Sequence, residues 1–176
     1  MAGTLGHQSS IPGRQFGQMC FTKAARAIGT APTGFNTTGT TTYTIDGVFK
    51  TFAAQTSRAF VSPAPLNSAG TATDTAPGYV VQGVNSTIYY TVGVDVNGNF
   101  GVAQGQPNGP VTSPIGIGAY GSGNVPDLPM GWCPFGLVKV VTTASTTFTP
   151  GTTALNAAGI TATFYDQALI PSIGKP

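Results

Sequence analysis

The segment YYTVGVDVNGNFGVAQG, residues 89–105, decides the fold class of this chain, because it has the pattern of two short strands joined by a turn. Apolar residues recur at every second position, which is the period of a strand that buries one face. The turn is expected at Asn97-Gly98, since both residue types tolerate the positive φ of tight hairpin turns. One apolar face is expected to carry Ile88, Tyr90, Val92, Val94 and Val96, with Phe100 and Val102 opposite them.

A second hairpin is expected before this one. Residues 40–55, TTTYTIDGVFKTFAAQ, place Tyr43 and Ile45 on one face of a strand. The strand is followed by Asp46-Gly47, a strong turn signal, and by another apolar run. The segment therefore predicts two strands joined by a two-residue turn.

Two further strands are expected towards the C-terminus. Residues 135–143, FGLVKVVTT, are nearly continuously apolar, as in a strand that is covered on both faces, and residues 159–166, GITATFYD, alternate. Two loop-like connections separate the strand segments: residues 60–77, rich in Pro, Ala, Ser, Thr and Asn, and residues 107–134, rich in Gly and Pro. Several short strands with long connections and little helix predict an all-β fold, a β-sandwich of plain or jelly-roll type.

The chain before Thr40 has a different texture, short of strand pattern and rich in Gly, Pro, Gln and Ser. Within it, residues 21–29 offer Thr22 as an N-cap and Gly29 as a stop, which is enough for a helix of at most two turns. We therefore expect an extended N-terminal arm over residues 1–39 and a β-sandwich domain over residues 40–176.

The composition of the chain limits its functions. Only 7% of the 176 residues are charged, against about 25% in an average soluble domain, while 40% are hydrophobic, so a folded core is expected. The net charge of +2 is too small for the basic stripe of a nucleic-acid-binding domain, and no nucleic acid partner is expected. All five acids are Asp, a residue that suits turns better than helices.

No signal peptide or membrane span is visible in the sequence, so we expect a protein that is made and used without passing through a translocon and that has no membrane partner. Cys20 and Cys133 are then better read as two reduced, partly buried thiols than as a disulfide.

Residues with catalytic or ligand-binding chemistry are sparse. GIGAYG, residues 116–121, fits a dinucleotide-binding pattern but lacks the preceding strand and following helix, so a loop is expected. His7 is the only histidine, which argues against a catalytic triad and against a zinc site. Most of the Asp residues fall at turns or strand ends, which disfavours a carboxylate pair or a Ca²⁺ site. We expect no enzyme activity, no cofactor and no metal.

Four segments, taken in order, carry a resemblance to a known family. They are YTIDGVFKTF (43–52), YYTVGVDVNGNFGVAQG (89–105), VPDLPMGWCPFGLVKV (125–140) and TTFTPGTTALNAAGITATFYD (146–166). In texture and order this chain resembles the head decoration, or cement, proteins of tailed bacteriophages. The resemblance implies a β-sandwich module that is made in the host cytoplasm and lies in the virion on the outside of a capsid. It also implies a symmetric oligomer, a dimer or a trimer, that binds the major capsid protein and clamps neighbouring capsomers.

Under this resemblance the arm becomes the candidate contact segment. Its cations Arg14, Lys23 and Arg26 are expected to contact capsid protein, with Phe16, Met19 and Phe21 as apolar anchors. An arm that exchanges between copies of the same oligomer is nearly as well supported.

Strand aromatics are further interface candidates, and these are Tyr89, Phe164 and Tyr165. A weaker interpretation is a stacking platform for bases or sugars, formed by Tyr89, Tyr90, Phe100, Phe164 and Tyr165. The alternative function is a receptor- or glycan-binding module at the tip of a phage tail fibre or surface appendage.

Overall fold

The computed structural model describes residues 18–60, 81–105, 125–126, 128 and 131–168. These residues form β-strands and no helix, which confirms the expected all-β, sandwich-like class. The strands are β1 (Gln18–Cys20), β2 (Arg26–Ile28), β3 (Gly34–Thr37), β4 (Thr41–Ile45), β5 (Val48–Phe52), β6 (Gln55–Ala59), β7 (Thr87–Asp95), β8 (Phe100–Gln104), β9 (Trp132–Thr142) and β10 (Ile160–Asp166).

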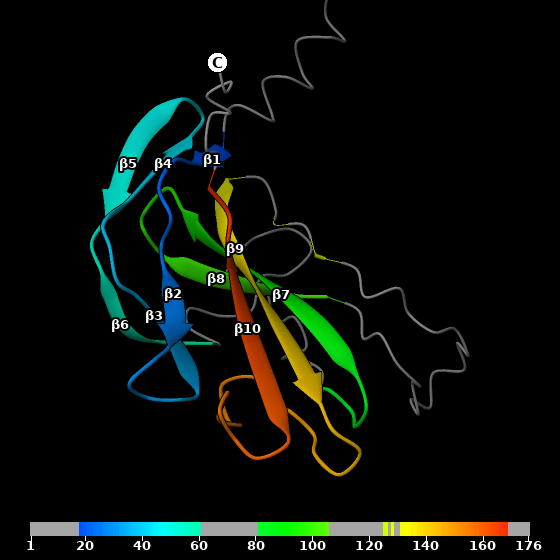
Figure 1. The fold of residues 1–176 in the computed structure, drawn as a ribbon. Helices are drawn as coiled ribbons and strands as arrows, with labels where there is room; N and C mark the ends of the chain where they lie inside the picture. Colours follow the sequence, from blue (N-terminus) through cyan, green and yellow to red (C-terminus); the bar gives the residue numbers. More distant parts are fainter. Residues whose placement is uncertain (1–17, 61–80, 106–124, 127, 129–130, 169–176) are drawn as a thin grey trace, which may run out of the picture.

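The strands form three antiparallel sheets, with orders β1-β4-β5, β2-β3-β6 and β10-β9-β7-β8 (Figure 1). β1 and β4 contact β9, and β2 contacts β10, so both three-stranded sheets pack beside the four-stranded one. The expected hairpins and C-terminal strands thus occur as β4–β5, β7–β8, β9 and β10.

The core is dominated by aromatic rings drawn from all three sheets. The Phe52 ring centroid lies 5.1 Å from that of Phe100, 5.3 Å from Phe135 and 5.9 Å from Tyr43. Such tilted and edge-to-face pairs stabilise a core beyond the area that they bury. A second group, Phe60, Tyr90 and Phe148, has centroids 4.9–6.1 Å apart.

The β4–β5 hairpin has the predicted turn. Ile45 pairs with Val48, and Asp46 and Gly47 between them have φ of 50° and 78°. Positive φ at both central residues is the signature of the type I′ turn, whose twist matches that of the strands. Tyr43 and Ile45 are buried on the inner face of the sheet, as expected.

The β7–β8 hairpin has a longer loop than predicted. Its apolar face is buried as expected at Ile88, Tyr90, Val92, Val94, Phe100 and Val102. The strand ends at Asp95, because its Oδ1 accepts the N–H groups of Asn97 and Asn99, both at 2.8 Å. Val96 therefore lies in the loop and is exposed, so its expected place on the buried face was wrong.

The stretch expected to form a short helix contains β2 instead. Ala25 has a left-handed φ of 46°, which interrupts a helix, and Arg26–Ile28 pair with β3. A two-turn helix is marginal in water, whereas a strand beside β3 gains ladder hydrogen bonds. β1, β2 and β3 also place residues 18–37 within the sheets, and residues 1–17 of the expected arm lie outside the described residues.

β9 is covered less completely than its apolar run predicts. Val138, Val140 and Thr142 are buried, while the alternate residues from Leu137 to Val141 are only half-buried. Its second face is therefore partly open, and the expectation of two covered faces was wrong for this half of the strand.

A β-bulge lies in the first half of β9. Val92 pairs with Gly136, and Gly93 pairs with Pro134, which leaves Phe135 as the extra residue. A bulge redirects side chains, and here Phe135 is fully buried while Gly136 also lies against a buried side chain, that of Arg26.

Candidate functional site

The outer face of the β1–β4–β5 sheet is the strongest candidate for a functional surface. Successive residues of a strand alternate between faces, and Tyr43 and Ile45 point into the core. Thr44 therefore points outward, and the strand register places Met19 on one side of it and Phe49 on the other.

Phe21 completes this surface by stacking on Phe49. The two ring centroids are 5.4 Å apart with an interplanar angle of 27°, and the side chains are 37% and 71% exposed. The pair is thus a flat aromatic surface that faces solvent. We call the residues Met19, Phe21, Thr44 and Phe49 the Phe21–Phe49 face. The exposed aromatic pair makes this face a candidate for protein contact.

Thr44 lies beneath this surface. It is 3% exposed although it sits on the outer side of the sheet, between Met19 and Phe49 in the strand register. Its Oγ1 has no hydrogen-bond partner in the part of the chain that the structure describes. Thr44 is therefore a buried polar residue at the centre of the Phe21–Phe49 face.

Two of the predicted contact residues, Met19 and Phe21, belong to this face. Lys23 is exposed two residues beyond Phe21. Arg14 and Phe16 lie outside the described residues.

Arg26 has a different role from the expected surface contact. Its side chain has no exposed area, and Nε lies 3.3 Å from Oδ1 of Asp166. Nη2 donates to the carbonyl of Leu137 at 3.1 Å and to that of Tyr165. Burial lowers the pKa of Arg26, and the Asp166 carboxylate opposes that shift. A cation in this position is part of the interior, and the prediction that it contacts a partner was wrong.

The predicted interface aromatics divide between the two faces of the four-stranded sheet. Phe164 pairs with Val138, packs against the core and lies 6.0 Å from the Arg26 guanidinium. It is therefore a half-buried residue on the core side of the sheet. Tyr89 and Tyr165 lie on the opposite face, where Tyr89 is half-buried and Tyr165 is 45% exposed.

Phe49 is the site residue that sequence reasoning missed. The signal was present, because Val48 and Phe49 are consecutive apolar residues in a strand. Alternation requires one of two such neighbours to point away from the core. What the sequence did not show is that Phe21 comes from another segment to meet it.

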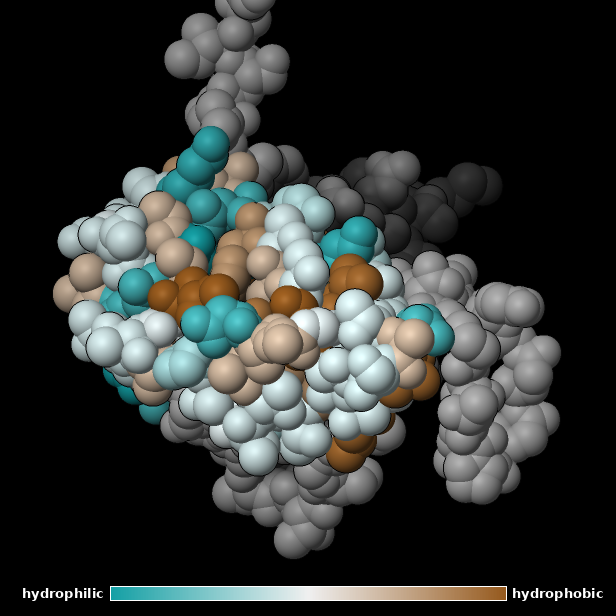
Figure 2. All heavy atoms as spheres, turned by 60° about the horizontal axis from the view of Figure 1, so that its bottom comes forward, coloured by the Kyte–Doolittle hydropathy of each residue, from teal (hydrophilic) through white to brown (hydrophobic). Residues whose placement is uncertain are grey.

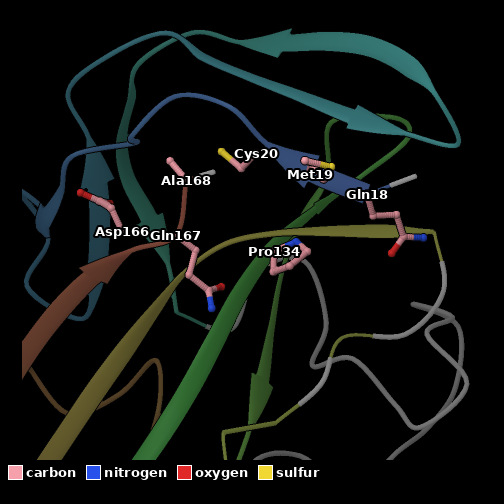
Figure 3. Close-up of a pocket in the computed structure, with 7 residues that line it drawn as sticks. All are labelled: Gln18, Met19, Cys20, Pro134, Asp166, Gln167 and Ala168. Carbon is pink, nitrogen blue, oxygen red and sulfur yellow. The ribbon is translucent and has the colours of Figure 1, made fainter. Parts of the chain in front are cut away.

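A pocket of about 390 Å³ lies beneath β1 (Figure 3). β1 contributes Gln18, Met19 and Cys20, β9 contributes Pro134, and the end of β10 and the residues after it contribute Asp166, Gln167 and Ala168. Its only ionised group among these is Asp166, whose charge is already paired with Arg26. The pocket therefore presents mainly neutral amide and apolar groups.

The two thiols are poor nucleophiles in this setting. Cys20 and Cys133 are both buried and free, in agreement with the expected reduced state. Burial raises the pKa of Cys20 to about 11 and that of Cys133 to about 12. The thiolate is the reactive form, so both groups are unreactive near neutral pH.

The carboxylates that the structure describes have structural roles. Asp46 forms the β4–β5 turn, Asp95 caps the β7–β8 loop, and Asp166 pairs with Arg26. Within the described ranges, no group of three or more His, Cys, Asp or Glu side chains is arranged to hold a metal ion. His7, Asp127 and residues 116–121 lie outside those ranges.

The described surface is weakly polar over wide areas. Figure 2 shows the face at the bottom of Figure 1, where near-white residues predominate and strongly hydrophilic ones are few.

In the ranges described, no helix is long and apolar enough to cross a membrane.

Comparison of the chain with models of protein families, with curated proteins and with solved structures finds no match.

Proposed function

We propose that this protein is a non-catalytic structural protein of a virion. It binds the outside of a bacteriophage capsid as a symmetric dimer or trimer and joins neighbouring capsomers through contacts with the major capsid protein. The phage assignment draws on the resemblance of four sequence segments to head decoration proteins. The binding role draws on the Phe21–Phe49 face.

The exposed aromatic stack is the observation that carries the proposal. Phe49 is 71% exposed, and Phe21 stacks on it. Aromatic residues are enriched at the centres of protein interfaces, where they supply much of the binding energy. A low surface charge also suits such a contact, because few ions need to be desolvated.

Oligomerisation strengthens binding to a repeating shell. Binding of one subunit makes engagement of the next effectively intramolecular, so modest contacts hold a copy firmly on a repeating shell.

The proposal is tested by co-sedimentation of the full-length protein with undecorated capsids from its own source. We expect saturable binding by the natural chain and about tenfold weaker binding by Phe49→Ser, since loss of an interface aromatic costs about 1 to 2 kcal/mol and about 1.4 kcal/mol is tenfold in affinity. Val96→Ser is the matched control, because Val96 is also exposed but lies at the tip of the other hairpin. We expect this variant to bind like the natural chain.

Absence of binding by the natural chain would overturn the capsid proposal. Saturable binding to host cells or glycans in the same preparation would replace it with the receptor-binding fibre-tip module.

A further inference from the structure

β5 is an open edge of its sheet. The strand order places β4 on one side of β5, and among the described strands none lies on the other side (Figure 1). Exposed edges of this kind pair readily with strands from other chains.

The ladder shows which backbone groups of β5 are open. In an antiparallel pair, alternate residues direct N–H and C=O towards the same neighbour. Thr42 bonds towards β1, because its carbonyl accepts the N–H of Phe21 at 2.8 Å and its own N–H donates to Oγ1 of Thr22 at 2.7 Å. Tyr43 and Ile45 therefore bond to Lys50 and Val48, and the N–H and C=O of Phe49 and Thr51 point away from the sheet.

The side chains beside this open edge differ between its two faces. Phe49 lies on the outer face with Phe21 stacked on it. Lys50 lies on the other face, across from Tyr43 and between the two outward-pointing backbone positions. A strand added to β5 would therefore meet an aromatic surface on one face and a cation on the other.

Lys50 disfavours pairing of β5 with a second copy of β5. Two copies of β5 paired antiparallel over their full length, with Phe49 opposite Thr51, would place Lys50 opposite Lys50 of the second copy. Those two residues would form the closer, non-hydrogen-bonded pair, where like charges are destabilising. Lysine on an edge strand is a known protection against such self-pairing.

We propose that β5 accepts an extended strand of a different protein by β-strand addition, with an Asp or Glu opposite Lys50 and an apolar side chain against Phe49. The inference rests on the proposed function, which makes the capsid protein the donor of that strand. Main-chain hydrogen bonds to Phe49 and Thr51 supply affinity in this mode, and the two flanking side chains supply selectivity.

Thr51→Pro tests the backbone contact directly. Proline removes the outward N–H of residue 51 but no bond to β4, and edge strands tolerate proline at such positions. We expect Thr51→Pro to bind undecorated capsids at least about tenfold more weakly than Thr51→Ala, which keeps the N–H, because the lost bond and the bulk of the ring both oppose pairing.

Lys50→Glu tests the charge. Reversal turns an attraction with the opposing acid into a repulsion, and we expect about tenfold weaker binding. Lys139→Glu, the same change on a half-buried lysine of the four-stranded sheet, is the matched control and should bind like the natural chain.

Hydrogen exchange gives a readout that does not depend on any variant. In the free protein the amides of Phe49 and Thr51 should exchange quickly and that of Lys50 slowly, and capsids should slow the first two. Two outcomes would overturn strand addition and leave the proposed function standing. One is that the natural chain binds capsids without slower exchange at Phe49 and Thr51. The other is that Thr51→Pro binds capsids as tightly as the natural chain. If the natural chain does not sediment with capsids, the proposed function fails, and this inference fails with it.

Discussion

Arg26 links two strands that are far apart in the sequence, β2 and β10. It lies on β2, while Asp166 ends β10, and the guanidinium also sits 5.7 Å from the ring centroid of Phe135. The glycine at 136 makes room for it, because a Cβ there would overlap the guanidinium. The pair therefore holds a small sheet against the large one.

We expect Arg26→Met to lower the free energy of unfolding by about 3 kcal/mol, since removing one partner of a buried pair leaves the other uncompensated. Denaturant unfolding followed by fluorescence measures this change. Arg26→Met combined with Asp166→Leu should recover part of the loss, and Lys139→Met, which breaks no pair described here, should change stability by less than about 0.5 kcal/mol. If Arg26→Met alone lowers the free energy of unfolding as little as Lys139→Met does, the stabilising role of the Arg26–Asp166 pair is contradicted.

At the scale of elements, the β4–β5 hairpin depends on its turn. Gly47 has φ of 78°, and a Cβ added there would meet no atom within 4 Å beyond its chain neighbours in the described part of the chain. We expect Gly47→Ala to cost about 1 kcal/mol through backbone strain alone. Gly39→Ala is the control, because that position is equally open and has no positive φ. Thermal unfolding of both variants measures the difference, and equal midpoints would disprove the turn argument.

The same hairpin shows what a sequence can predict. Asp46-Gly47 encodes its turn locally, and the alternation of Tyr43 and Ile45 encodes its face, so both were predicted correctly. β2 was missed because its conformation depends on hydrogen bonds to β3, and the local sequence of a short segment does not show which strand will pair with it. The Phe21–Phe49 stack was missed for the same reason, since the two rings come from separate segments.

At the scale of the whole molecule, residues 18–29 belong to the body of the fold, since they contain β1 and β2. We expect the full-length protein to unfold in one cooperative transition on heating. A chain that begins at Thr30 should not fold, because it lacks β1, β2, the buried Ala24 and the Arg26 pair. Circular dichroism during heating separates these outcomes, and a cooperative transition in the shorter chain would contradict the assignment of β1 and β2 to the body of the fold.

The β7–β8 loop has a consequence for engineering. Asn97 in this loop is exposed, and Oδ1 of Asp95 holds the loop by accepting the N–H groups of Asn97 and Asn99. Exposed loop tips are the sites that best tolerate insertions. A peptide inserted after Asn97 would be displayed without interrupting a strand pairing, because β7 ends at Asp95 and β8 begins at Phe100.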